Sequence, residues 1–287
     1  MKNLKRYQYE RYAILCLASY PTTFNHLKYG FSRQGRTDIK DREGKTIIRV
    51  LWSETGDVIV VFKGSHSMKD WLINAAIFPK RISMGKDRKK TGFVHFGFHF
   101  LLFQPSLSPP LNFQHTIKDI PSTSTHELLL HHYSNGDEKI TVYQQLKEAL
   151  DPLISMGKRV SFTGHSSGGA MAVIAAELLQ HHYPDKIKRV VTFGQPAMGF
   201  WSFRQHYSLE KKTYRISCDV DIVTFLPGIP FLFWHVGKLL WLHNDKIYEN
   251  IPTPKRLYMT LRSWLFRPIA YHYMEKYIRR KNYFDHH

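Results

Sequence analysis

The chain has few cysteines and no long uninterrupted apolar run. Two cysteines, Cys16 and Cys218, occur in 287 residues, so at most one disulfide could form and a disulfide-stapled scaffold is excluded. Both lie in segments that we expect to be buried, where a free thiol behaves as a small hydrophobe. The most apolar stretch, 226–242, is interrupted by proline, glycine, histidine and lysine. This interruption favours a loop and a strand over a transmembrane segment.

The N-terminus resembles a secretory signal peptide only superficially. Basic residues precede the apolar stretch 12–18, but the stretch is short, Glu10 and Arg11 adjoin it, and no small-residue cleavage pattern follows. We interpret it as an amphipathic first helix. The expected localisation is cytoplasmic or peripheral to a membrane, and secretion without a recognisable signal peptide stays open.

Acidic residues are scarce relative to basic ones, with 23 Asp and Glu against 41 Lys and Arg and a net charge of +18. This charge favours anionic partners, but it does not choose among nucleic acid, a phospholipid surface and an acidic substrate. Signatures of nucleic-acid-binding motifs are missing, so we expect no nucleic-acid partner. Basic residues concentrate over 255–281 and alternate there with aromatic ones. Such a surface suits an anionic lipid interface, and a solvated face that keeps a basic protein soluble is the alternative.

Short β-branched runs alternate with helical patterns along the chain, with no internal repeat and no dividing linker. The runs that predict strands are 46–52, 58–62, 159–163, 189–193 and 213–217. Helices are predicted over 140–154 and 169–179. The first two strands should form a hairpin at one side of the sheet. The alternation indicates a single α/β domain over 1–287, with a mainly parallel central sheet and helices on both faces.

Two segments depart from this alternation. Residues 65–91 begin with a helical pattern over 68–76 and continue into a polar stretch over 80–90 that we expect to be mobile. Residues 104–138 shift to Pro, Ser, Thr, Asn and His with little periodicity, which predicts a long surface insertion.

A pentapeptide of the form G-x-S-x-G separates a predicted strand from a predicted helix. Its residues are Gly164, His165, Ser166, Ser167 and Gly168. In such an elbow the chain reverses so sharply that the serine adopts a strained backbone, and side chains at the flanking glycines would strike the strand or helix. The hydroxyl then lies at a helix N-terminus, where peptide dipoles favour negative charge. The pattern predicts that Ser166 is a nucleophile, against the alternative of a plain turn.

A serine nucleophile requires a base, an orienting acid and donors for the developing oxyanion. In α/β-hydrolases the acid and then the histidine follow the serine in the chain. Asp219 and Asp221 follow the 213–217 strand, where catalytic side chains of open α/β sheets lie. We expect Asp219 to cap the turn.

Five histidines follow Asp221: His235, His243, His272, His286 and His287. The last two close the chain and are expected to fray. His235 alternates within 233–236, which suggests a strand, whereas His272 opens a helical pattern over 272–278, where it can project into a cleft. Any one of these histidines could instead be an ordinary hydrogen-bonding partner.

Seven motifs in order give the chain a resemblance to the class 3 lipases, the fungal-lipase-like branch of the α/β-hydrolases, over most of its length. They are VFKGS (61–65) followed by DW (70–71), VHFGF (94–98), GHSSGG (164–169), FGQP (193–196), DIV with LP (221–223 and 226–227), WHVG (234–237) and HYMEKYI (272–278). The resemblance implies an α/β-hydrolase fold with a lid segment at about 66–92 that covers the cleft and opens at a lipid surface.

The resemblance further implies a catalytic triad of Ser166, Asp221 and His272. It implies an oxyanion hole formed by the backbone N–H groups of Ser65, assisted by its hydroxyl, and of Ser167. The position of Ser167 suits this role, because the first N–H groups of a helix have no acceptor within that helix. No metal and no organic cofactor is expected.

Three departures from the family pattern affect substrate preference and lid geometry rather than the triad. Lys63 stands where the family usually has an arginine, so a side chain that can form two parallel hydrogen bonds is lost near the oxyanion loop. Ser167 replaces a leucine after the nucleophile, and the stretch 195–199 lacks an arginine after its proline.

The expected activity is serine-dependent hydrolysis of lipid acyl esters, as in a triacylglycerol lipase, through an acyl-enzyme. A phospholipase or monoacylglycerol lipase that prefers anionic membranes is the alternative within the enzyme class. An inactive lipase-fold protein that binds lipid or a partner is the alternative of another class.

Overall fold

The computed structural model describes residues 3–64, 78–84, 90–107, 140–229, 231–260 and 268–286. Within these ranges an eight-stranded sheet has the order β1-β2-β3-β6-β7-β8-β9-β10, and β4 pairs with β5 separately. The strands are β1 (Arg36–Lys40), β2 (Thr46–Leu51), β3 (Val58–Phe62), β4 (Pro79–Met84), β5 (Lys90–His95), β6 (Val160–His165), β7 (Ile187–Phe193), β8 (Thr213–Cys218), β9 (Lys238–His243) and β10 (Lys246–Glu249). Strands β3, β6, β7, β8 and β9 pair in parallel, whereas β1, β2 and β10 join antiparallel.

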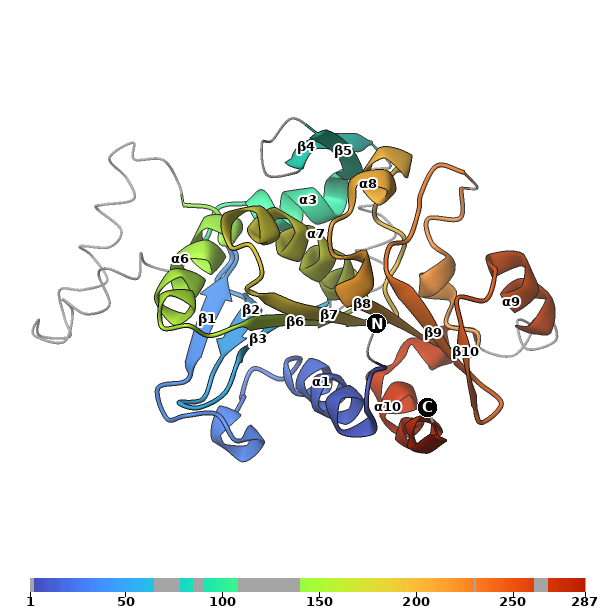
Figure 1. Ribbon diagram of the computed structural model, residues 1–287, viewed down its shortest axis with the longest axis horizontal. Coiled ribbons are helices and arrows are strands. Elements are labelled where there is room, and N and C mark those ends of the chain that lie inside the picture. Colours follow the sequence, from blue (N-terminus) through green and yellow to red (C-terminus); the bar gives the residue numbers. More distant parts are fainter. Residues whose placement is uncertain are drawn as a thin grey trace, which may run out of the picture.

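Helices cover both faces of the sheet (Figure 1). One face carries α1 (Arg6–Ala18) and α10 (Met274–Ile278), and the other carries α3 (Phe96–Phe103), α6 (Val142–Ser155), α7 (Ser167–His182) and α8 (Trp201–His206). Helix α9 (Thr253–Thr260) lies beside the β10 edge (Figure 1). The short 3₁₀ helices are η1 (His26–Tyr29), η3 (Glu210–Lys212), η4 (Ile222–Phe225), η6 (Pro268–His272) and η7 (Lys281–His286).

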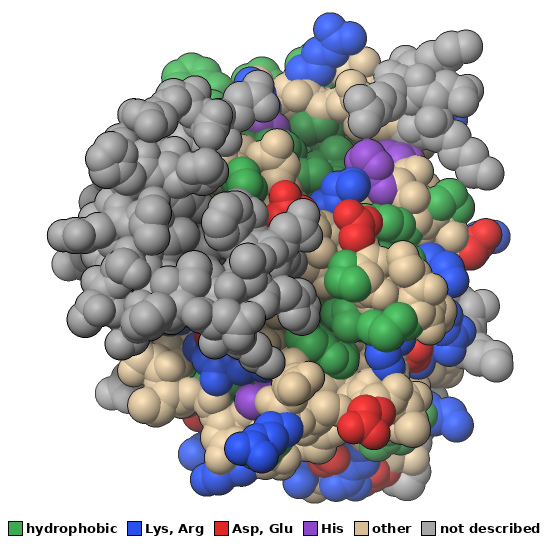
Figure 2. Space-filling model, turned by 90° about the vertical axis from the view of Figure 1, so that its left-hand side faces the viewer, with side chains coloured by type: hydrophobic (Ala, Val, Ile, Leu, Met, Phe, Trp, Pro, Cys, Tyr) green, Lys and Arg blue, Asp and Glu red, His purple; other side chains and the backbone are tan. Residues whose placement is uncertain are grey.

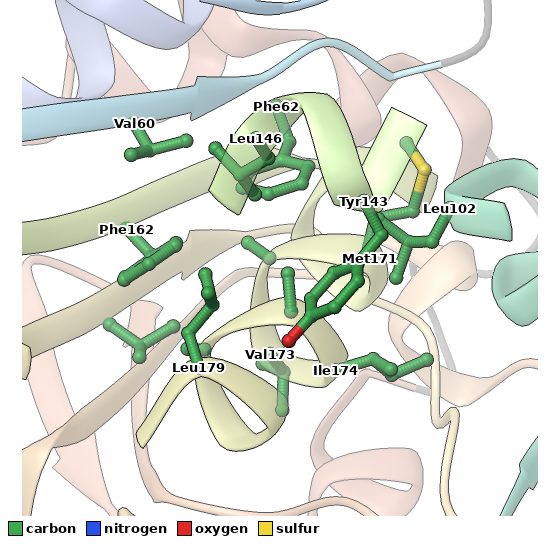
Figure 3. Packing of buried hydrophobic residues seen from close by; sticks show 14 of the residues in the cluster. Val60, Phe62, Leu102, Tyr143, Leu146, Phe162, Met171, Val173, Ile174 and Leu179 are labelled. Carbon is green, nitrogen blue, oxygen red and sulfur yellow. The ribbon is translucent and has the colours of Figure 1, made fainter. Parts of the chain in front are cut away.

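The larger core lies between the sheet and helices α3, α6 and α7, and it includes Phe62 and Phe162 of adjacent strands and Met171 of α7 (Figure 3). Strands β3 and β6 are buried along their whole length, as expected for parallel strands covered on both faces. The first turn of α7 packs closely on β3 because it is built from small residues. A Cβ at Gly168 would lie 2.4 Å from the carbonyl oxygen of Phe62.

A second core joins the two ends of the chain on the other face. Tyr9 of α1 stacks on Phe284 with ring centroids 4.2 Å apart, and its hydroxyl donates to the carbonyl oxygen of Tyr277 at 2.6 Å. The first helix and the last elements therefore lie side by side beneath β6, β7 and β8 (Figure 1).

The structure confirms the expected α/β architecture, the hairpin of β2 and β3, the first helix and the two free, buried cysteines. The mainly parallel sheet has helices on both faces, as predicted. The edge strands β1 and β10 were not predicted from the sequence. Among the described helices, none combines the length and apolarity needed to cross a bilayer.

Two predictions of secondary structure were wrong. The described part of the polar stretch 80–90 is not a mobile loop but the β4–β5 hairpin, in which Ile82 and Met84 are buried. Their period-2 spacing among cationic residues is a strand signal that the surrounding charge conceals. Residues 233–236 are not a strand, since only an isolated bridge from Trp234 to Gly199 forms there. The predicted helix at 68–76, and the insertion at 104–138 beyond residue 107, lie outside the described residues.

Candidate active site

Ser166 lies at the sharp turn from β6 to α7, as the strand, turn and helix pattern predicts. Its φ of 57° and ψ of −131° lie in a region that non-glycine residues rarely occupy. Its N–H donates to the carbonyl oxygen of Phe193 at 2.9 Å, which ties the turn to the end of β7. A Cβ at Gly164 would lie 2.4 Å from the carbonyl oxygen of Gly168, so the turn requires glycine there.

Ser167 is the first residue of α7, a buried helix of 16 residues. Its backbone lies at the positive end of the helix dipole, next to the Ser166 hydroxyl, so it suits stabilisation of a developing anion. Ser65, the second predicted oxyanion donor, and most of the predicted lid at 66–92 lie outside the described residues. The oxyanion hole and the lid therefore stay predictions.

Asp221 and His272 form a close pair. Both carboxylate oxygens of Asp221 lie 3.0 Å from Nδ1 of His272. Asp221 follows β8 and is the N-cap of η4, where its Oδ1 accepts the N–H of Val223 at 3.0 Å. Because the carboxylate accepts only, His272 must carry its proton on Nδ1, which leaves Nε2 as a proton acceptor.

Burial by itself would raise the pKa of Asp221, because its side chain has no exposed surface. Attraction to His272 and hydrogen bonds from His272 and Tyr277 outweigh burial and hold the pKa below its ordinary value. Tyr277 donates its hydroxyl to Oδ2 of the same carboxylate. Asp221 is therefore a buried, ionised acceptor for two donors.

The Asp221–His272 pair and Ser166 meet at the same end of β7. A Cβ at Gly194, whose φ is +56°, would lie 2.7 Å from Oδ2 of Asp221 and 2.9 Å from Nδ1 of His272. The preceding residue, Phe193, accepts the N–H of Ser166. The rings of His272 and His165 lie 4.4 Å apart, centroid to centroid. The elbow and the acid–histidine pair are thus neighbours.

The other candidates from the sequence have different contacts. Asp219 binds Nδ1 of His243 at 2.8 Å and forms an ion pair with Arg280. His235 shares a hydrogen bond of 3.0 Å between its Nε2 and the carbonyl oxygen of Thr224. These contacts hold loops together and do not include the Asp221–His272 pair. The side chains of His286 and His287 lie outside the described residues.

Two tyrosines at the site were not predicted. Tyr277 lies within the 272–278 motif, five residues after His272, but only the packing of α10 shows that it reaches Asp221. Tyr20 follows α1, and its hydroxyl lies 2.7 Å from Nδ1 of His165. No periodicity in the sequence indicates the second contact, because 145 positions separate the partners.

In the described parts of the chain, no group of three His, Cys, Asp or Glu side chains is arranged to hold a metal ion. The expectation that the protein needs no metal or cofactor stays a prediction.

Solved structures with a similar fold are fungal lipases. The lipase of Rhizopus microsporus var. chinensis superposes with a TM-score of 0.59 at 19% identity, covering 93% of this chain and 85% of that one. Lipase II of Rhizopus niveus gives a TM-score of 0.56 at 18% identity, with coverages of 83% and 81%. At these identities the similarity shows the fold, which is that of the α/β-hydrolases.

Sequence relatives are also named lipases. Lipase ZK262.3 of Caenorhabditis elegans is 36% identical over 101 residues, which are 34% of this chain and 28% of that protein. The lipase of Rhizomucor miehei is 25% identical over 194 residues, 66% of this chain and 42% of that protein. The chain thus spans less than half the length of these relatives. The family model described as "Lipase (class 3)" matches residues 59–231, more than half of the chain, which therefore belongs to the class 3 lipase family.

Proposed function

We propose that this protein hydrolyses carboxylic esters of lipids, with Ser166 as nucleophile, His272 as general base and Asp221 as the acid that orients it. The observation that carries the proposal is the hydrogen-bonded pair of Asp221 and His272, in which both carboxylate oxygens lie 3.0 Å from Nδ1 of the histidine. This pair lies beside Ser166, whose backbone is strained. This arrangement leaves Nε2 of His272 as the proton acceptor that a serine hydroxyl requires. The named relatives, which are lipases, support the same activity.

The reaction follows from these positions. As Oγ of Ser166 attacks the acyl carbon, Nε2 of His272 takes the hydroxyl proton and the carbonyl oxygen becomes an oxyanion. The backbone N–H groups of Ser167 and Ser65 are the proposed donors to that oxyanion. His272 then gives its proton to the leaving alcohol. In the second half of the reaction, His272 deprotonates a water that attacks the acyl carbon. The bond from that carbon to Oγ of Ser166 then breaks, His272 returns the proton to Oγ, and the fatty acid is released.

The decisive experiment combines the variant Ser166→Ala with active-site labelling. We expect a fluorophosphonate probe to label the wild-type protein at Ser166, and chromogenic acyl esters to be hydrolysed. Ser166→Ala should lose both activities with an unchanged melting temperature, whereas Ser155→Ala, at an exposed position on α6, should keep both. Turnover by Ser166→Ala would refute the nucleophile. A wild-type protein that is neither labelled nor active would favour the inactive, lipid-binding alternative.

Anionic phospholipid or monoacylglycerol is the second candidate substrate, with a peripheral membrane location. It is favoured by the net charge of +18 and by Tyr258 and Tyr273, which are 81% and 62% exposed within the basic segment 255–281. On the face shown in Figure 2, by contrast, Lys and Arg side chains are interspersed with Asp and Glu. Hydrolysis on anionic vesicles that salt inhibits, with no such inhibition on neutral emulsions, would support this candidate.

A further inference from the structure

Tyr20, which is half-buried, and the buried His165 form a chain of hydrogen bonds next to Ser166. The hydroxyl of Tyr20 lies 2.7 Å from Nδ1 of His165, and Nε2 of His165 lies 2.7 Å from the carbonyl oxygen of His272. The backbone of Gly64 also forms a hydrogen bond with the Tyr20 hydroxyl. These hydrogen bonds thus connect the backbone of Gly64, the residue before Ser65, through the elbow residue His165 to the backbone of His272.

The direction of each bond is determined by its partners. A carbonyl oxygen only accepts, so Nε2 of His165 must carry a proton and donate it to His272. Burial, with a smaller contribution from the nearby His272, lowers the pKa of His165 to about 3, so its ring is neutral and Nδ1 holds a lone pair. Tyr20 must therefore donate its hydroxyl to Nδ1, and its oxygen is left to accept the N–H of Gly64.

The space around Gly64 leaves no room for a side chain. A Cβ at this position would lie 2.6 Å from the Tyr20 hydroxyl and 3.3 Å from Cβ of Ser166. Only glycine allows the strand end, the tyrosine and the nucleophile to approach so closely.

We infer that Tyr20 and His165 are positioning residues, which hold the backbone before Ser65 and the backbone of His272 at a set separation around Ser166. The inference rests on the proposed function, because it assigns the chain a purpose in ester hydrolysis. Both ends of the hydrogen-bond chain are backbone groups of segments that supply the oxyanion donor and the base. Small displacements of such groups reduce rate more than affinity, because the geometry of the transition state is more demanding than that of binding.

The first test is the variant Tyr20→Phe, which keeps the ring and removes only the hydroxyl. Its matched control is Tyr12→Phe on α1, where the lost hydroxyl belongs to a buried side chain and bonds to Ser161 instead. We expect kcat of Tyr20→Phe to fall between about 10- and 100-fold with KM unchanged within about two-fold. The rate of fluorophosphonate labelling should fall by a similar factor. Tyr12→Phe should lose thermal stability without losing kcat.

The second test separates the two ends of His165. In His165→Gln the side-chain amide can reach the position of Nε2 and still donate to the His272 carbonyl, whereas in His165→Asn it reaches only the position of Nδ1. We expect the Gln variant to keep more kcat than the Asn variant. Equal losses, with equal losses of melting temperature, would indicate a merely structural role.

Nitrogen NMR of the His165 ring, assigned by its loss in His165→Gln, tests the chain without reference to activity. We expect a neutral ring protonated at Nε2 at pH 7, and a shift of the Nδ1 resonance in Tyr20→Phe. An Nδ1-protonated ring would overturn the inference, as would an active wild-type protein whose Tyr20→Phe and Tyr12→Phe variants share the same kcat. If the wild-type protein neither hydrolyses esters nor reacts with the probe, the proposed function fails and the positioning role fails with it. The NMR result would then still decide whether the hydrogen-bond chain exists.

Discussion

The hydroxyl of Tyr277 donates a hydrogen bond to Oδ2 of Asp221, the carboxylate that also binds His272. Asp221 is fully buried, so it depends on these donors to remain ionised in a low-dielectric surrounding. Tyr277 therefore stabilises the ionised acid of the proposed triad. It does so from α10, the helix that packs against α1.

Replacing Tyr277 by Phe should raise the pKa of Asp221, because one of the hydrogen bonds that lower it is lost. A buried hydrogen bond to a charged group contributes about 1.5–3 kcal/mol, so we expect kcat to fall by about 10-fold or more. Carboxyl NMR and ester kinetics measure the two effects. The control is Tyr273→Phe, which removes the hydroxyl of an exposed side chain. An unchanged pKa of Asp221 in Tyr277→Phe would contradict the role of this bond.

Replacing Gly194 by Ala should inactivate the protein while preserving its fold. The new Cβ would strike Oδ2 of Asp221 and Nδ1 of His272, and the positive φ of Gly194 would be strained. We expect a loss of kcat/KM of about 100-fold, since displacement by a fraction of an ångström is costly at a reacting centre. Gly157→Ala, which shares a positive φ but has no neighbour within 4 Å, tests the strain alone and should stay active.

His95 makes stability depend on pH. It is buried at the N-cap of α3, where Nδ1 accepts the N–H of Gly97 at 3.1 Å, and burial lowers its pKa to about 4. An unfolded histidine has a pKa of about 6.5, so between about pH 6.5 and 4 the unfolded chain binds more protons and stability falls as pH falls. His95→Asn keeps a capping oxygen and removes the titration. Melting temperatures from pH 7 to 4 should decline less steeply in the variant, and parallel declines would refute the assignment.

Arg256 is buried beneath the Asp221 turn, where it donates to Oγ of Ser217 at 2.6 Å and to Oγ1 of Thr224 at 2.9 Å. Its guanidinium also lies over the Phe225 ring, 4.5 Å from the centroid. Both hydrogen bonds come from one nitrogen, Nη2, so the feature that Lys cannot reproduce is the planar guanidinium over the Phe225 ring. Arg256→Lys should therefore lower the free energy of unfolding by about 1–2 kcal/mol. Denaturant unfolding measures it. Arg159→Lys, at a side chain that is 55% exposed, should change stability little.

Much of the candidate site could be predicted from the sequence because its signals are local. The glycines around Ser166, the β-branched run before it and the small residues after it all act within one turn of chain. The order of serine, acid and histidine then restricted the partners to the last third of the chain. That step narrowed the choice to Asp221 and His272 only with the help of the family resemblance.

Other features could not be predicted because their causes are not local. The β4–β5 hairpin contains two buried side chains among cations, and its position depends on packing against α7 and α8. Asp219 was expected to cap a turn, but its carboxylate pairs with His243 and Arg280, which approach from β9 and from the end of α10. Composition and periodicity contain no information about such partners.

The sequence by itself determined the alternation of strands and helices, the elbow at Ser166 and the family to which the chain is related, because hydrophobic period and glycine sterics act over a few residues. Only the tertiary structure decided which donors surround Asp221 and His165. Tyr277 and Tyr20 come from opposite ends of the chain, and they reach the site because α1 and α10 pack together under the same sheet. A hydrogen bond between such distant positions depends on ångström-scale packing, which no local pattern encodes.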